Sequence, residues 1–302
     1  MNGRVALIAS AIAAMLGSAH AETVALLVPA LKDDARQAIA LGPHGEVYAP
    51  DGTGAWVRTQ RIATANDLVV AGRAGGDVVA AGDGAVYKLA PNGWSAIRLH
   101  QKDKATMASG SRAVAAVKRQ LYALDRTRRG EPEKLAVAPA AILAIGAGKT
   151  IVIATDRGLA RVEGKQVTPI AGAPRRVVRL VDDRWAIVDT GVYDLRAGKS
   201  IAWPTGAKFQ AATAVDDKLV AVVAIGRTRE LITIAKGALA RQVIDATPAG
   251  TAVGVVVDKA GRVVVALADG RMLLRDRGTW TATVVKDALP AARPGPAPAR
   301  VP

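Results

Sequence analysis

The chain of 302 residues carries a formal net charge of +15 and is half hydrophobic, with only 3% aromatic residues and no cysteine. Apolar surface on this scale offsets the entropy of ordering the chain, so the composition excludes a disordered protein. The absence of cysteine excludes disulfides, thiol catalysis, thiolate metal sites and a cysteine-borne lipid anchor.

Residues 1–21 have the composition of an export signal. Arg4 supplies a positive start, Val5 to Leu16 is an apolar run, and Ala19-His20-Ala21 fits a small-x-small cleavage site. The alternatives are a short buried helix or an uncleaved anchor, but the run is shorter than the about 20 residues that a span requires. We predict cleavage after Ala21, no transmembrane segment in the mature chain and a periplasmic location, with secretion as the alternative.

A short phrase recurs along the mature chain. It consists of an apolar strand, a tight turn and a strand with an aromatic or large aliphatic residue, repeated at intervals of 30 to 41 residues. Its seven copies lie at 55–59, 85–89, 120–124, 158–162, 191–195, 230–234 and 271–275. Strands repeated at this spacing, without helical periodicity, indicate a propeller or a stack of sheets.

Each repeated unit accommodates four strands. In the last unit they begin near Ala252, Arg262, Arg271 and Thr279, and in the second unit one of the turns is expected at 72–76. Asp-Gly and Asn-Gly pairs elsewhere in these units are typical of two-residue hairpins, because they supply positive φ angles.

These features predict an all-β fold with a single β-propeller over residues 22–289. We expect seven four-stranded blades, with six or eight as the nearby alternatives. The strand at Thr23 to Val28 is expected to close the ring by pairing with the edge of the last blade. Residues 290–302 are proline-rich and predict an extended or disordered tail.

Two copies of the phrase resemble a known repeat. Leu121-Tyr-Ala-Leu-Asp-Arg-Thr-Arg-Arg-Gly130-Glu and Gly191-Val-Tyr-Asp-Leu-Arg-Ala-Gly198-Lys-Ser-Ile-Ala-Trp203 are similar to the PQQ-like propeller repeat. The resemblance implies that Trp203 packs between blades, as the tryptophan of that repeat does. Gly42-Pro-His-Gly-Glu-Val-Tyr-Ala-Pro-Asp51 instead resembles the NHL or gluconolactonase type of propeller repeat. PQQ enzymes use a vicinal cysteine pair that this chain lacks, so no cofactor site is carried over.

Three further patterns are candidate sites. Gly146-Ala-Gly-Lys-Thr150 imitates a phosphate-binding loop, but Leu143 stands where the first glycine belongs, so a hairpin turn is predicted. Asp182-Asp183 and Asp216-Asp217 are carboxylate pairs suited to acid/base or cation chemistry, yet they fall at equivalent turns of successive units.

Ligands for a metal are scarce in the mature chain. Its only asparagines are Asn66 and Asn92, and its only histidines are His44 and His100. We therefore predict no catalytic, cofactor-binding or metal-ligating residue and no cofactor.

The basic residues are densest at Arg126, Arg128 and Arg129 and at Arg175, Arg176 and Arg179. They are interpreted either as solvated turns or as a surface for anionic partners. Aromatic residues are not interleaved with them, so nucleic acid is not an expected partner. The resulting hypothesis is an exported, monomeric, non-enzymatic scaffold that binds a protein or an anionic envelope component. The alternative is a lactonase- or lyase-type enzyme with a divalent cation at the propeller axis.

Overall fold

The computed structural model describes most of residues 24–286. The described ranges are 24–29, 34–51, 53–60, 68, 70–74, 77–82, 85–90, 93–97, 99, 105–110, 112–128, 131–244 and 250–286. The predicted signal at 1–21 and the predicted tail at 290–302 lie outside these ranges. Asn66, Asn92, His100 and Arg129 do so as well, and the side chains of Arg126 and Arg128 are not described.

The described residues form 28 β-strands, no α-helix and one short 3-10 helix, η1 (Ala35–Gln37). Every strand pairs antiparallel with the next strand of its own group of four, as the tight turns in the sequence predicted.

Three groups of four strands are separate sheets. The first contains β5 (Val70–Ala74), β6 (Asp77–Gly82), β7 (Ala85–Ala90) and β8 (Gly93–Ile97). The second contains β17 (Arg179–Val181), β18 (Trp185–Val188), β19 (Gly191–Asp194) and β20 (Lys199–Ala202). The third contains β21 (Ala207–Val215), β22 (Lys218–Ile225), β23 (Thr228–Ala235) and β24 (Ala238–Val243).

Two further sheets have eight strands, and each joins two groups of four. One joins β1 (Leu26–Val28), β2 (Ile39–Leu41), β3 (Val47–Pro50) and β4 (Trp56–Gln60) to β25 (Ala252–Val257), β26 (Val263–Leu267), β27 (Arg271–Asp276) and β28 (Thr279–Lys286). The other joins β9 (Ala105–Gly110), β10 (Val114–Val117), β11 (Gln120–Arg128) and β12 (Glu131–Val137) to β13 (Ile142–Ala147), β14 (Ile151–Thr155), β15 (Gly158–Glu163) and β16 (Gln166–Pro169).

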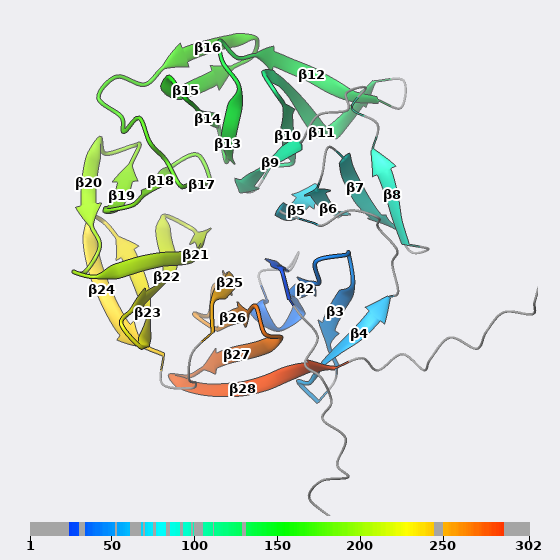
Figure 1. Cartoon of the computed structure of the whole chain (residues 1–302), viewed down its shortest axis with the longest axis vertical. Helices are drawn as coiled ribbons and strands as arrows, with labels where there is room; N and C mark the ends of the chain where they lie inside the picture. Colours follow the sequence, from blue (N-terminus) through cyan, green and yellow to red (C-terminus); the bar gives the residue numbers. More distant parts are fainter. Residues whose placement is uncertain are drawn as a thin grey trace, which may run out of the picture.

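These groups are arranged as a ring of about seven blades (Figure 1). The first strand of a blade lies near the centre of the ring and the fourth lies at the rim, as β9 and β12 show. We name each blade by its strands. The arrangement is the propeller that the repeated phrase predicted.

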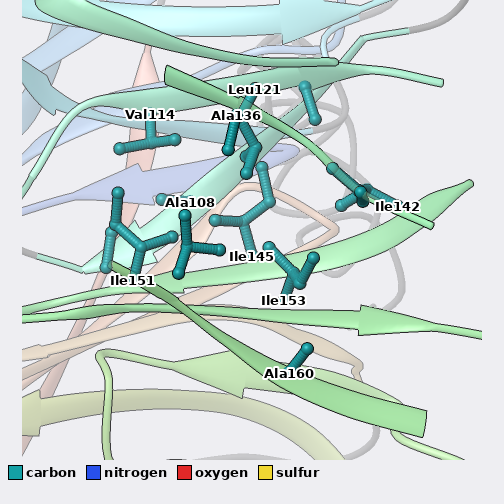
Figure 2. Close-up of a cluster of buried hydrophobic side chains, with 13 residues drawn as sticks. Ala108, Val114, Leu121, Ala136, Ile142, Ile145, Ile151, Ile153 and Ala160 are labelled. Carbon is teal, nitrogen blue, oxygen red and sulfur yellow. The ribbon is translucent and has the colours of Figure 1, made fainter. Parts of the chain in front are cut away.

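The core lies between neighbouring blades. Figure 2 shows one apolar cluster, in which Ala108, Val114 and Leu121 of blade β9–β12 face Ile145 and Ile153 of blade β13–β16. Middle strands are covered on both sides by such clusters, which is why β26 is a continuous apolar run with every residue buried. Each fully buried valine, leucine or isoleucine contributes about 1.5–3 kcal/mol, so the ring is stabilised by packing without disulfides.

The prediction for ring closure is wrong. β1 pairs antiparallel with β2 and is the innermost strand of its own blade, not an edge partner of the last blade. The two ends of the ring instead meet at the rim, where β28 pairs in parallel with β4 through Val285↔Trp56 and Lys286↔Val57. The physical reason is that residues 26–60 supply all four strands of the first blade, so the chain needs no strand exchange.

Two local predictions also need correction. The first copy of the phrase, at 55–59, is the fourth strand of its blade, whereas the other six copies are third strands. The third strand of the first blade is β3, which carries Tyr48. The error arose because the turn before β4 resembles the turn before a third strand. Asp51 caps this turn by accepting hydrogen bonds from the backbone of Thr53 and Ala55. The turn expected at 72–76 begins later, because Gly72 is still paired with Val79.

Candidate binding face

The two ends of the blades differ in their connections. Because consecutive strands are antiparallel, the turns between first and second strands and between third and fourth strands lie at one end. We call this end the hairpin face. The turns between second and third strands and the crossovers from blade to blade lie at the other end, which we call the crossover face.

On the hairpin face, charged side chains from two blades bind one another and a threonine of a third blade. Asp183, in the turn between β17 and β18, is 5% exposed and accepts hydrogen bonds from the backbone N of Thr150 at 2.8 Å and its Oγ1 at 3.1 Å. It also pairs with Arg196 at 3.2 Å. Asp217, from the next blade, pairs with Arg196 at 3.0 Å and with Arg184 at 3.2 Å. This network joins blades β13–β16, β17–β20 and β21–β24.

Asp194 is the buried anchor of that network. It accepts three hydrogen bonds from the Arg184 guanidinium, at 3.2, 3.1 and 2.8 Å, while Arg184 also lies 4.4 Å from the centre of the Trp185 ring. Burial acts to raise the pKa of Asp194, but the hydrogen bonds from Arg184, Ala197 and Arg196 outweigh it and lower the pKa overall. The hydrogen bond to Asp194 in turn raises the pKa of Arg184.

A second network on the hairpin face joins the first and last blades. Arg262 donates to Asp258 at 2.5 Å and pairs with Asp34 at 2.9 Å, and Arg36 pairs with Asp276 at 2.5 Å. Asp34 also caps η1 by accepting a hydrogen bond from the backbone N of Arg36 at 3.0 Å. The carboxylates of both networks are therefore engaged within the fold.

The crossover face exposes aliphatic side chains. The large hydrophobic residues exposed in the described part of the chain are Val137, Leu143, Val178 and Val243, with 46–64% of their surface accessible. Val137 and Val243 end the outer strands β12 and β24, while Leu143 and Val178 lie where the chain enters β13 and β17. All four therefore lie at crossovers between blades.

Basic residues lie in turns and crossovers of the same face as these aliphatic residues. Two hydrogen bonds hold the Val137–Leu143 crossover against the β10–β11 turn: Ala138 N donates to the Arg119 carbonyl at 2.8 Å and Ile142 N donates to that of Lys118 at 2.7 Å. Among the described residues of this face, basic side chains outnumber acidic ones. The exposed basic residues in its turns and crossovers are Lys118, Arg119, Arg157, Arg175, Arg176 and Arg227.

Two arginines of the crossover face are partly or fully enclosed. Arg229 is 5% exposed and donates to the Gly250 carbonyl at 2.6 Å, and burial together with the charge of Arg271 lowers its pKa despite the nearby carboxylate of Asp269. Arg179 opens the innermost strand β17, and burial alone lowers its pKa. Of the dense basic spot of the sequence at 175–179, Arg179 therefore lies at the inner part of this face.

The candidate motifs of the sequence are turns. Residues 146–150 form the β13–β14 hairpin, in which Gly148 N donates to the Thr150 carbonyl at 3.0 Å. Asp182 and Asp216 occupy equivalent first-to-second-strand turns with φ of 54° and 51°, so the turn interpretation of both pairs is confirmed. In the described part of the chain, no three His, Cys, Asp or Glu side chains gather closely enough to hold a metal ion.

The innermost strands approach one another closely. A Cβ atom at Gly146 of β13 would clash with the Asp182 carbonyl beside β17, and one at Gly254 of β25 would clash with Leu27 of β1. Cα atoms of β9 also lie within 8 Å of those of β17 and β21. Only glycine permits such backbone contact between blades.

Comparison with solved structures decides the fold. The chain is similar to the WD40 β-propeller domain of Doa1, with a TM-score of 0.59, 14% identity and coverage of 83% of this chain and 91% of that one. It is also similar to the computationally designed Ika8 protein, with a TM-score of 0.55, 12% identity and coverage of 88% and 98%.

This chain is a β-propeller. A third similar structure, YCF48 bound to D1 peptide, has a TM-score of 0.53 and 13% identity over 91% of this chain and 95% of that one. No protein-family model and no curated protein matches the sequence. Identities this low establish the fold of the propeller alone.

The resemblance of two copies to the PQQ-like repeat predicted that Trp203 packs between blades, and it does. Trp203 is 7% exposed and belongs to the cluster between blades β17–β20 and β21–β24. Its ring stacks on Phe209 with centroids 6.4 Å apart, and its Nε1 donates to the Val188 carbonyl at 3.3 Å. No helix in the described part of the propeller is long and apolar enough to span a membrane.

Proposed function

We propose that the mature chain is an exported, non-enzymatic propeller scaffold that binds an acidic protein or anionic envelope component through its crossover face. The observation that carries the proposal is the coincidence of exposed aliphatic side chains and basic turns at one end of the blades. Apolar contacts within a charged rim are the usual composition of a protein-binding surface, and the positive rim steers acidic partners toward it.

Two features support the proposal. The described carboxylates of the hairpin-face networks are engaged with arginines of their own chain, whereas the exposed aliphatic side chains lie on the crossover face. Structures similar to this one include YCF48 with a bound peptide and a propeller in the Mitotic Checkpoint Complex, which are proteins solved in complexes.

We also infer seven blades and a monomer. The blade number is supported by the apolar clusters, because each cluster of the described residues contains side chains from two neighbouring blades and together they run around the ring. The repeat phrases of the sequence favour the PQQ-like or NHL-like type.

The face assignment is tested by crosslinking. A photoreactive residue replacing Val178 on the crossover face is expected to form one discrete crosslinked species in the native cell envelope. The matched control replaces Lys218, which is exposed on the hairpin face. Equal crosslinking from both positions, or crosslinking from position 218 alone, would contradict the assignment.

The charge of the face is tested on the same crosslinked species. Arg175→Glu and Arg176→Glu are each expected to lower its yield or the partner's affinity about fivefold, corresponding to about 1 kcal/mol for an exposed charge. Lys236→Glu on the hairpin face is the control and should leave binding unchanged.

Export and the enzymatic alternative have separate tests. We expect the N-terminus of the protein recovered from the envelope to be Glu22, and an N-terminus at Met1 would refute cleavage. A stoichiometric divalent ion in the purified mature protein would overturn the non-enzymatic assignment in favour of the lactonase- or lyase-type alternative.

A further inference from the structure

The outermost strands of the blades present strand edges at the rim of the ring. Among the described strands, β8, β12, β16, β20 and β24 are each the last strand of a sheet. Proteins usually protect such an edge from pairing with a further strand by a charged side chain, a proline or a short strand. These five strands follow that rule: β8 has five residues and begins with Gly93, and the others carry Pro132, Pro169, Lys199 and Arg241.

The rim strand β28 does not follow this rule. It is eight residues long, and residues 279–285 contain no charged residue, proline or glycine. Most of them are threonine or valine, which favour strands. β4 pairs with the outer edge of β28 only at Val285 and Lys286, at one end of the strand (Figure 1). Within the described part of the chain, residues 279–284 therefore have no strand on their outer edge.

The hydrogen bonds of β28 indicate which backbone groups point to this outer edge. Val285 N donates to the Gly270 carbonyl at 2.9 Å, on the side of β27. Residues of an antiparallel pair alternate between facing the partner strand and facing away from it. Thr281 therefore also bonds to β27, whereas Trp280 and Ala282 direct their N–H and C=O groups away from it. The side chains of Thr281 and Ala282 are exposed, so solvent reaches this edge.

Each end of the edge carries an exposed cation. Arg277 lies in the turn before β28, and Lys286 is the last residue of the strand. The carboxylate of Asp276, which precedes Arg277, is engaged by Arg36. Two copies of this chain that paired edge to edge in antiparallel fashion would bring Arg277 of one copy near Lys286 of the other. Like charges therefore disfavour self-association, whereas a strand with acidic ends would meet opposite charges.

We propose that the outer edge of β28 at residues 279–284 binds an extended segment of a partner protein, uncharged and β-branched in its middle and acidic at both ends. The segment adds a strand to the last blade, and backbone hydrogen bonds with Trp280 and Ala282 supply its affinity. Its acidic ends pair with Arg277 and Lys286, which fixes its position along the edge. The site lies on the rim, so it does not depend on the assignment of the crossover face.

The test uses the purified mature chain and a labelled synthetic peptide. In the peptide, an alternating valine–threonine run as long as residues 279–284 lies between aspartates. Its fluorescence anisotropy is expected to rise saturably with the mature chain. Ala282→Glu should weaken binding by at least about tenfold, because it places a like charge on the edge beside the acidic peptide. Ala240→Glu, the same change at an exposed position of rim strand β24, is the matched control and should leave binding unchanged.

A backbone variant separates strand pairing from charge. Ala282→Pro removes an N–H that points to the outer edge and removes none that bonds to β27, so it should abolish peptide binding. Ala282→Val keeps the N–H and should bind the peptide as the wild type does.

Hydrogen exchange of the wild type covers the possibility that the proline variant does not fold. In the free chain, the amides of Trp280 and Ala282 should exchange at least about tenfold faster than those of Thr281 and Thr283, which bond to β27. Bound peptide should slow the first two amides and leave the other two unchanged.

Three results would overturn the proposal: anisotropy that does not rise, binding that survives Ala282→Glu, or amides of Trp280 and Ala282 that the peptide does not protect. Sedimentation of the mature chain provides a further check. A dimer that Ala282→Glu abolishes would mean that a second copy of this chain occupies the edge, and it would overturn the proposal as well.

Discussion

The hairpin face and the crossover face are built from the same kinds of residue but use their charges differently. On the hairpin face, Asp183, Asp194 and Asp258 are buried and each pairs with an arginine of its own blade. On the crossover face, arginines such as Arg175 and Arg176 are exposed beside exposed aliphatic side chains. Charge that is engaged in the fold stabilises the ring, whereas charge left at the surface is available to a partner.

The largest expected effect comes from removing a carboxylate of the hairpin face. Asp194→Ala should lower the free energy of unfolding by about 3 kcal/mol, because it removes the buried carboxylate of the largely enclosed Arg184 and leaves only the exposed Asp217 as its ion-pair partner. Urea denaturation of the mature chain measures this change. Asp156→Ala, an exposed carboxylate of the crossover face, is the control and should change stability by less than about 0.5 kcal/mol. Equal losses in the two variants would remove the distinction between the faces.

The second effect is the dependence of stability on pH. Hydrogen bonds and charges of Thr150, Arg196, Arg184 and Arg262 lower the folded-state pKa of Asp183, Asp194 and Asp258 against the opposing effect of burial. Groups whose folded pKa is depressed contribute stability above their unfolded value of about 3.9 and lose it as the pH falls through the folded value.

The melting temperature should therefore be nearly constant from pH 7 to about pH 5 and decrease below about pH 4. Thermal melts of wild type and Asp194→Asn across this range check the prediction, and the variant should show a shallower acid decrease. A decrease that begins near neutral pH would point to groups outside the hairpin-face networks.

The smallest effect is expected for the aliphatic residues of the crossover face. Leu143→Ser and Val178→Ser should each change the free energy of unfolding by less than about 0.5 kcal/mol, because both side chains are more than half exposed. Leu180→Ser is the matched control, since this leucine is fully buried and truncation of such a residue costs about 2–5 kcal/mol. Large losses at 143 and 178 would show that these side chains serve the fold and not a partner.

The sequence predicted the all-β class, the ring and most strands. Tight turns and apolar runs are local signals, so the strands of the last blade begin at or next to the expected residues. The first copy of the phrase was assigned to the fourth strand of its blade in place of the third, and this error also had a local cause. Trp56 follows a capped turn and resembles the aromatic third strands elsewhere, although Tyr48 is the equivalent residue.

The two faces could not be predicted from charge density alone. Arg175, Arg176 and Arg179 form one dense spot in the sequence, yet the structure exposes the first two and partly buries the third, which opens the innermost strand β17. Their environments depend on strand direction and on which blade packs against β17. The equivalent turns at Asp182-Asp183 and Asp216-Asp217 were a usable signal, because paired aspartates at first-to-second-strand turns mark the hairpin face.

The parallel pairing of β28 with β4 has a consequence for how the ring opens. Each blade is complete within one continuous stretch of sequence, so the only place where the ring lacks a covalent connection is between the last blade and the first. Among the described residues, strand pairing spans that boundary at two positions on the rim, assisted by an apolar cluster and the ion pair of Arg262 with Asp34. We expect mechanical or thermal opening of the ring to begin at this junction, while each blade keeps its four strands paired.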